Sequence, residues 1–159
     1  MKKRLLLSLC FLFPSVLLAE WNIEKPSQNI PKTLTGNIFG KEFTLGQAEW
    51  NQHALTLRSQ DKMGVWPESE LLIFLKQEEN KNEWLITPDQ SDFNDPHIHM
   101  KFGKKGSQFP GTLMFTSEYS LYLKLLKKDA KKALFQIHLS LPDYEKSFLL
   151  GSFTAKITK

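Results

Sequence analysis

Two histidines, His97 and His99, are the residues of this sequence whose type and spacing most directly suggest chemistry. Residues two apart in an extended strand point to the same face, so both imidazoles could reach one metal ion. We expect zinc or copper, with further ligands from His138 on another strand and from Asp95 or Asp92 in the preceding loop. A solvent-facing strand also accepts histidine readily, and an ordinary polar face that holds no metal is the simpler interpretation of the pair.

The sequence offers little support for catalysis. It has no Gly-x-Ser-x-Gly elbow for a nucleophilic serine, and its one cysteine, Cys10, lies in an apolar N-terminal segment. The loop that contains Asp89, Asp92 and Asp95 offers oxygen ligands to calcium, but in an order unlike that of a helix–loop–helix calcium site. We therefore predict a protein that is not an enzyme and has no cofactor apart from the zinc or copper that the histidine pair would take.

Large aromatic side chains are a second resource for binding. Several of them would suit a groove for a sugar or a peptide, although filling the core is their ordinary use in a small domain. An exposed edge strand that pairs with a partner chain is a further way to bind. The aromatic residues that could line such a groove are Trp50, Trp66, Trp84, Tyr119 and Tyr122.

Alternation of polar and apolar residues places the histidine pair on a strand. From His97 to Phe102 the polar residues face one way, and Ile98, Met100 and Phe102 face the other. The run from Leu71 to Leu75 is continuously apolar, which suits a short strand buried on both faces. The other expected extended segments are 33–39 and 42–45 around a glycine turn, 54–58, 84–87, and 148–157 with Gly151 at a bulge.

Residues 119 to 141 predict a long hairpin. Alternation runs from Tyr119 to Leu125 and resumes from Ala133 to Leu141, with lysines at the tip between them. Apolar residues of the same stretch also fall at helical spacing, so an amphipathic helix is the alternative. We prefer strands because the alternation is unbroken on both sides of the lysines, whose charge also discourages edge pairing.

A series of short strands separated by turn residues predicts an all-β fold. We expect an antiparallel β-sandwich, immunoglobulin-like or jelly-roll-like, with a barrel as the alternative. The expected organisation is a signal peptide over 1–19, an irregular leader over 20–32, and a single β domain over 33–159. A domain of this length can bury a substantial core.

The N-terminal residues have the layout of a secretory signal. A basic start over residues 2–4 precedes an apolar run over 5–18, and the small residue Ala19 stands where cleavage is expected. The run is shorter than the roughly 20 residues of a spanning helix, so we expect no membrane-spanning segment after cleavage. Loss of Cys10 with the signal would leave a chain without cysteine, which fits a bacterial periplasm. We predict a periplasmic or secreted protein.

Charge is unevenly distributed along the chain. Without residues 2–4 the 21 basic residues fall to 18, against 17 acidic ones, so a global basic surface for nucleic acid is not expected. Residues 20–100 hold 7 basic and 13 acidic residues, whereas residues 101–159 hold 11 and 4. This pattern suits either oppositely charged neighbouring strands or a cationic face for an anionic surface such as membrane lipid or cell-wall polymer.

These observations favour an exported, non-catalytic binding or structural protein of the bacterial envelope. Its partner would be an unknown protein or an envelope polymer, and we expect no nucleic acid partner. The alternative function is that of a periplasmic protein that binds copper or zinc through His97 and His99.

Overall fold

A computed structural model describes residues 21–75, 81–90, 92, 94–104 and 106–158 of the protein. All regular secondary structure within these residues is β-strand, which confirms the predicted all-β class. The predicted signal peptide, 1–19, lies outside the described residues. The strands are β1 (Thr35–Ile38), β2 (Lys41–Glu42), β3 (Leu45–Asn51), β4 (Ala54–Ser59), β5 (Lys62–Met63), β6 (Trp66–Pro67), β7 (Ser69–Phe74), β8 (Glu83–Ile86), β9 (His97–Phe102), β10 (Gly111–Phe115), β11 (Ser120–Lys128), β12 (Lys132–Ser140) and β13 (Phe148–Ile157).

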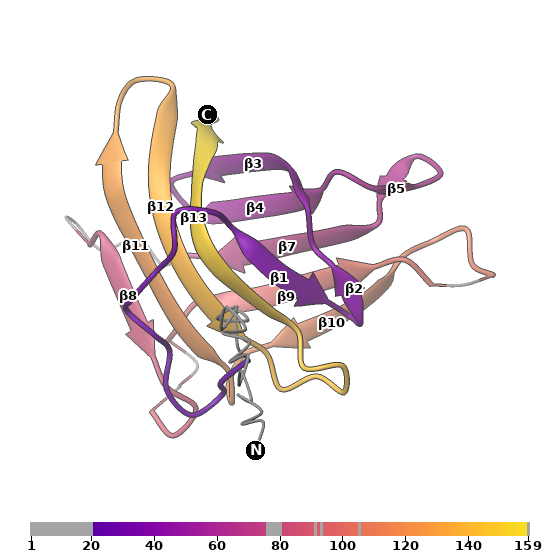
Figure 1. The fold of residues 1–159 in the computed structure, drawn as a ribbon, viewed down its shortest axis with the longest axis horizontal. Coiled ribbons are helices and arrows are strands. Elements are labelled where there is room, and N and C mark those ends of the chain that lie inside the picture. Colours follow the sequence, from indigo (N-terminus) through magenta and orange to yellow (C-terminus); the bar gives the residue numbers. More distant parts are fainter. Residues whose placement is uncertain (1–20, 76–80, 91, 93, 105, 159) are drawn as a thin grey trace, which may run out of the picture.

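Most of these strands form one eleven-stranded sheet that curls into a half-barrel (Figure 1). Its main path runs β10-β9-β7-β4-β3-β13-β12-β11-β8, and β1 pairs with β13 and with β2 beside this path. Neighbouring strands are antiparallel except β13 and β3, which pair in parallel through Lys156–Glu49 and Ile157–Trp50. The sheet is therefore mixed rather than purely antiparallel, and its curl is compatible with the expected sandwich or barrel. Strands β5 and β6 form a separate small sheet.

The core is built from alternate residues of strands in both halves of the curled sheet. Leu55 and Leu57 on β4 and Leu121 and Leu123 on β11 are fully buried, while the residues between Leu55 and Leu57 and beyond them reach the other face. A strand with one buried face requires this period of two. Because the sheet curls, the apolar faces of strands that are far apart along the sheet meet in one core.

The large aromatic residues mostly fill the interior. Trp84, Tyr119 and Tyr122 are buried, and Trp50 is half-buried. Trp66, on β6, is the exposed member of the five aromatic residues that the sequence suggested for a groove. These five residues therefore do not line a common groove.

The hairpin expected over 119–141 is present as β11 and β12, so the helical alternative is wrong. The strand expected around Leu71 is present as β7, but it is buried mainly on one face. Ile73 is fully buried, whereas its neighbour Phe74 is 38% exposed. Most of β3 and all of β10 lie in segments where the alternation indicated no strand.

The chain before β1 lies across the outer side of β11 and β12. The Asn22 N–H donates to Ser140 Oγ (3.2 Å), and the Asn22 carbonyl accepts a bond from Ser120 Oγ (3.0 Å). The Ser27 N–H donates to Nδ1 of His138, a buried residue of β12. These bonds tie the irregular leader to the sheet as a strap.

Gly151 marks a close approach between the leader and β13 instead of the expected bulge. The residue pairs with Ile137 in the uninterrupted register of β12 and β13. Its φ is 146°, and a Cβ at this position would lie 2.3 Å from the carbonyl oxygen of Thr33. Glycine is therefore required here for steric reasons.

Candidate metal-binding and cationic surfaces

Strand β9 places His97 and His99 on the same face of the sheet, as the alternation predicted. Ile98 lies between the two histidines and Met100 follows His99. Both point to the opposite face and are fully buried in the core. The two histidines are half-buried on the outer face. A strand with one side fixed by core packing holds the imidazoles on the other side in a defined direction.

The ring of His99 lies against an apolar neighbour. Its centroid is 4.8 Å from that of Phe74, and the two rings meet edge to face at 67°. The pKa of His99 is lowered by burial, and the nearby charges of His97 and Lys101 lower it further. The lowered pKa favours the uncharged imidazole, which is the form that offers a lone pair to a metal ion.

The register of the sheet brings a thioether next to the histidine pair. Met114 on β10 stands directly opposite His99 in the β9–β10 ladder. On the other side of β9, Leu72 stands opposite His99 and Phe74 opposite His97. Directly paired residues of antiparallel strands share a face, with Cβ atoms about 4.5–5.5 Å apart. The histidines therefore lie in an apolar and sulfur-containing patch.

Of the other expected ligands, His138 lies in a different part of the sheet, and Asp95 lies in the loop just before β9. His138 is on β12, from which β9 is separated by β13, β3, β4 and β7 along the sheet, and its Nδ1 accepts the Ser27 N–H. Asp95 uses Oδ2 to accept the N–H of Asp92 (2.8 Å) within the loop before β9. No group of three or more histidine, cysteine, aspartate or glutamate residues suited to a metal occurs in the described part of the chain. The structure thus keeps the histidine pair together without His138.

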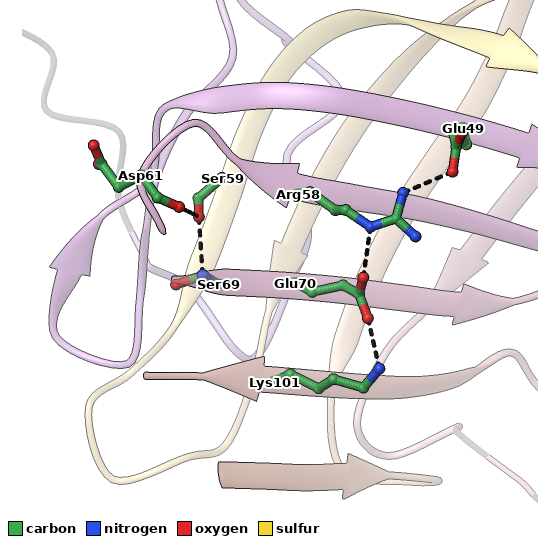
Figure 2. Close-up of polar contacts among 7 residues, drawn as sticks. All are labelled: Glu49, Arg58, Ser59, Asp61, Ser69, Glu70 and Lys101. Atoms are coloured by element: carbon green, nitrogen blue, oxygen red, sulfur yellow. Dashed lines mark hydrogen bonds and ion pairs between the residues drawn. The ribbon is translucent and has the colours of Figure 1, made fainter. Parts of the chain in front are cut away.

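A row of charged side chains crosses the outer face of the sheet (Figure 2), and its member Lys101 is two residues after His99 on β9. Arg58 on β4 donates from Nε to Glu70 (2.6 Å) and from one terminal nitrogen to Glu49 (2.6 Å). Lys101 on β9 donates to the second oxygen of Glu70 (2.7 Å). The four residues alternate in sign across β3, β4, β7 and β9, and we call them the charge ladder.

The carboxylate of Glu70 is the most buried charge of the ladder, with 11% of its side chain exposed. Burial alone would raise its pKa, but the hydrogen bonds from Lys101 and Arg58 outweigh burial and lower the pKa. The bond from Arg58 likewise lowers the pKa of Glu49. The lowered pKa values favour the charged form of both carboxylates, and the ladder adds ion pairs between strands that are already joined by backbone hydrogen bonds.

Figure 2 also shows how the chain is held where β4 leads into β5 and β7. Ser59 donates from Oγ to the carbonyl of Asp61 (3.0 Å) and accepts the N–H of Ser69 (2.9 Å) at the same oxygen. The Ser59 hydroxyl thus forms hydrogen bonds at both ends of the segment that carries β5 and β6.

A second charged surface lies at the end of the β11–β12 hairpin. Four exposed lysines cluster there, and we call them the lysine tip: Lys127, Lys128, Lys131 and Lys132. The hairpin projects beyond the neighbouring strands at the upper left of Figure 1. The expected position of the lysines at the turn is therefore correct.

The turn of the lysine tip is tightly hydrogen-bonded. Asp129 is the one acidic residue between Lys127 and Lys132, and its Oδ1 accepts the N–H groups of Lys131 (2.7 Å) and Lys132 (2.8 Å). These two backbone bonds lower the pKa of Asp129. The Lys131 carbonyl in turn accepts the N–H of Ile157 (2.8 Å), which joins the turn to β13. The backbone of the tip is thus held in a defined turn from which the exposed lysines project.

Comparison with known proteins adds no relative. No protein-family model matches the chain, and neither the curated proteins nor the solved structures contain a match to it. In the portion of the chain that the structure describes, no helix has the length and apolarity needed to cross a membrane.

Proposed function

We propose that this chain is an exported, non-catalytic binding protein that attaches to an anionic surface of the bacterial envelope through the lysine tip. The observation that carries the proposal is the clustering of four exposed lysines on one rigid turn whose single carboxylate is occupied by backbone N–H groups. Even with the negative charge of Asp129, the turn keeps an excess of positive charge that attracts an anionic surface.

The rigidity of the turn supports binding. Lys128 is still in register with Ala133 in the β11–β12 ladder, and its ammonium group lies 5.8 Å from the ring centroid of Trp50. Because the backbone is already ordered, little conformational entropy has to be lost when the lysines meet their ligand. Lys156 stands opposite Lys132 on β13 and extends the positive surface.

The predicted cleavage after Ala19 is compatible with the contacts that Trp21 and Asn22 make. Trp21 is two residues after the expected cleavage site at Ala19, and its indole N–H donates to the Leu141 carbonyl (3.1 Å). Asn22 is bonded to Ser120 of β11 and Ser140 of β12. A chain that starts after Ala19 would therefore keep the strap complete.

The proposal is tested by comparing binding of the purified protein to two kinds of vesicle. One contains anionic phosphatidylglycerol, and the other contains only neutral phosphatidylcholine. We expect binding to the anionic vesicles that weakens with salt, since exposed charges are screened over about 8 Å at 0.15 M ionic strength. A lysine near an anionic surface contributes about 1 kcal/mol, so glutamine at all four tip positions should weaken binding by up to about 1000-fold.

The matched control carries glutamine at four exposed lysines outside the tip, Lys25, Lys32, Lys62 and Lys104, and has the same net charge as the tip variant. It should retain most of the binding. Equal losses in the two variants would show that total charge, and not the tip, is responsible. Equal binding of the unmodified protein to both kinds of vesicle, or turnover of a hydrolase or redox substrate, would refute the corresponding part of the proposal.

A further inference from the structure

We propose that His97, His99 and Met114 form a binding site for monovalent copper on the outer face of β9 and β10. The site revises the ligand set expected from the sequence, since a methionine thioether takes the place of His138 and Asp95. It is independent of the proposed attachment through the lysine tip, which lies at the end of β11 and β12.

Strand register supplies the geometry of the site. His97 and His99 project from one face of β9, two residues apart, while Met114 stands opposite His99 on β10. Leu113 and Phe115, on either side of Met114, are half-buried, and Met114 itself is 67% exposed, so its side chain points away from the core. Two imidazoles and one thioether thus reach out from adjacent strands on the same side of the sheet.

The ring contacts of His99 also favour convergence of the two imidazoles. His99 packs against Phe74, whose direct partner on β9 is His97. The ring of His99 is thus in contact with the cross-strand partner of His97. A single ion placed over the two histidines can be shared by their rings.

The ligand types select the metal. A thioether is a soft ligand that prefers Cu(I), whereas zinc prefers harder or anionic partners in addition to imidazole. All three ligands are neutral when they bind, so a monovalent ion leaves one net charge in a patch bordered by Leu72 and Phe74, and a divalent ion leaves two. The neighbouring cation of Lys101 is paired with Glu70, which limits repulsion of the bound copper.

The exposure of the site suits exchange of the ion. Because Met114 is largely open to solvent, a donor or acceptor of copper can reach the metal without rearrangement of the sheet. The site is consequently suited to carrying Cu(I) rather than to burying it permanently.

The test uses the purified protein and Cu(I) under anaerobic conditions, with a chromophoric Cu(I) chelator in competition. We expect one equivalent of Cu(I) to bind, and Met114→Leu to weaken binding by more than roughly tenfold because a soft ligand is lost. Met63→Leu, which changes a methionine of β5, is the control and should leave the affinity unchanged. Titration with Zn(II) should give weaker binding that Met114→Leu does not alter.

A second measurement reports ligation directly. In protein labelled with carbon-13 at the methionine methyl groups, Cu(I) should shift the Met114 signal and leave the Met63 signal in place. His99→Gln should abolish this shift. The fold of the variant is expected to persist because position 99 lies on the outer face of the sheet. Absence of Cu(I) binding, or equal Cu(I) affinity in Met114→Leu and the unmodified protein, would overturn the proposed site.

Discussion

Glutamine in place of Glu70 should remove much of the stabilisation that the charge ladder provides. The carboxylate accepts one bond from Arg58 (2.6 Å) and one from Lys101 (2.7 Å). A hydrogen bond with a charged partner contributes about 1.5–3 kcal/mol, but both cations are about a third exposed, so solvent screens them. Glutamine also retains one oxygen acceptor. We therefore expect the free energy of unfolding to fall by about 2 kcal/mol at pH 7.

The pH dependence separates the charge of Glu70 from its shape. Because the pKa of Glu70 is lowered in the folded state, its contribution is complete above the ordinary value of 4.5 and is lost as pH falls through the folded value. The difference in unfolding free energy between the unmodified protein and Glu70→Gln should thus be constant from about pH 7 to pH 5.5 and shrink toward pH 3.

Urea unfolding at several pH values measures this difference, and Glu42→Gln on the exposed strand β2 is the control. The control should change the stability by less than about 0.5 kcal/mol, as is usual for surface positions. A difference for Glu70→Gln that stays the same from pH 7 to pH 3 would refute the reasoning, because the loss would then come from packing and not from ionisation.

Two further predictions concern the strap. Gly151→Ala should destabilise the fold by about 3 kcal/mol or more in urea unfolding, since its Cβ would lie 2.3 Å from the Thr33 oxygen, whereas Gly64→Ala, with open space around it, should cost only about 1 kcal/mol; similar costs for both would contradict the steric argument. His138→Phe removes the acceptor of the Ser27 N–H, which should loosen the strap by about 1–3 kcal/mol and accelerate trypsin cleavage after the exposed Lys32. An unchanged cleavage rate would show that this bond does not hold the strap.

The parts of the fold that were predictable from the sequence are those where packing follows the local pattern. The strand from His97 to Phe102 and the hairpin of β11 and β12 alternate cleanly because one face of each packs into the core. The run around Leu71 is misleading for the opposite reason. Leu72 and Phe74 are apolar but face outward, so the sequence pattern resembles that of a strand buried on both sides.

The candidate site depended on an element that the sequence pattern did not reveal. β10 follows a glycine-containing loop, and its residues Thr112, Leu113, Met114 and Phe115 are of types that strands favour. That composition was the signal available for a hairpin with β9. The pairing of Met114 with His99, however, is a property of register, which depends on long-range packing and not on local sequence. The separation of His138 from the pair has the same origin.

The parallel junction between β3 and β13 has a consequence for how the chain folds. Its two residue pairs, Lys156–Glu49 and Ile157–Trp50, join segments more than 100 residues apart, whereas the antiparallel hairpins on either side close over short loops. Closing so long a loop is entropically costly, so we expect the hairpins to form first and the junction last. Until the segment 148–157 is available, the two arms of the sheet stay apart. Under the proposed export, the sheet would close only after residues 148–157 have crossed the membrane.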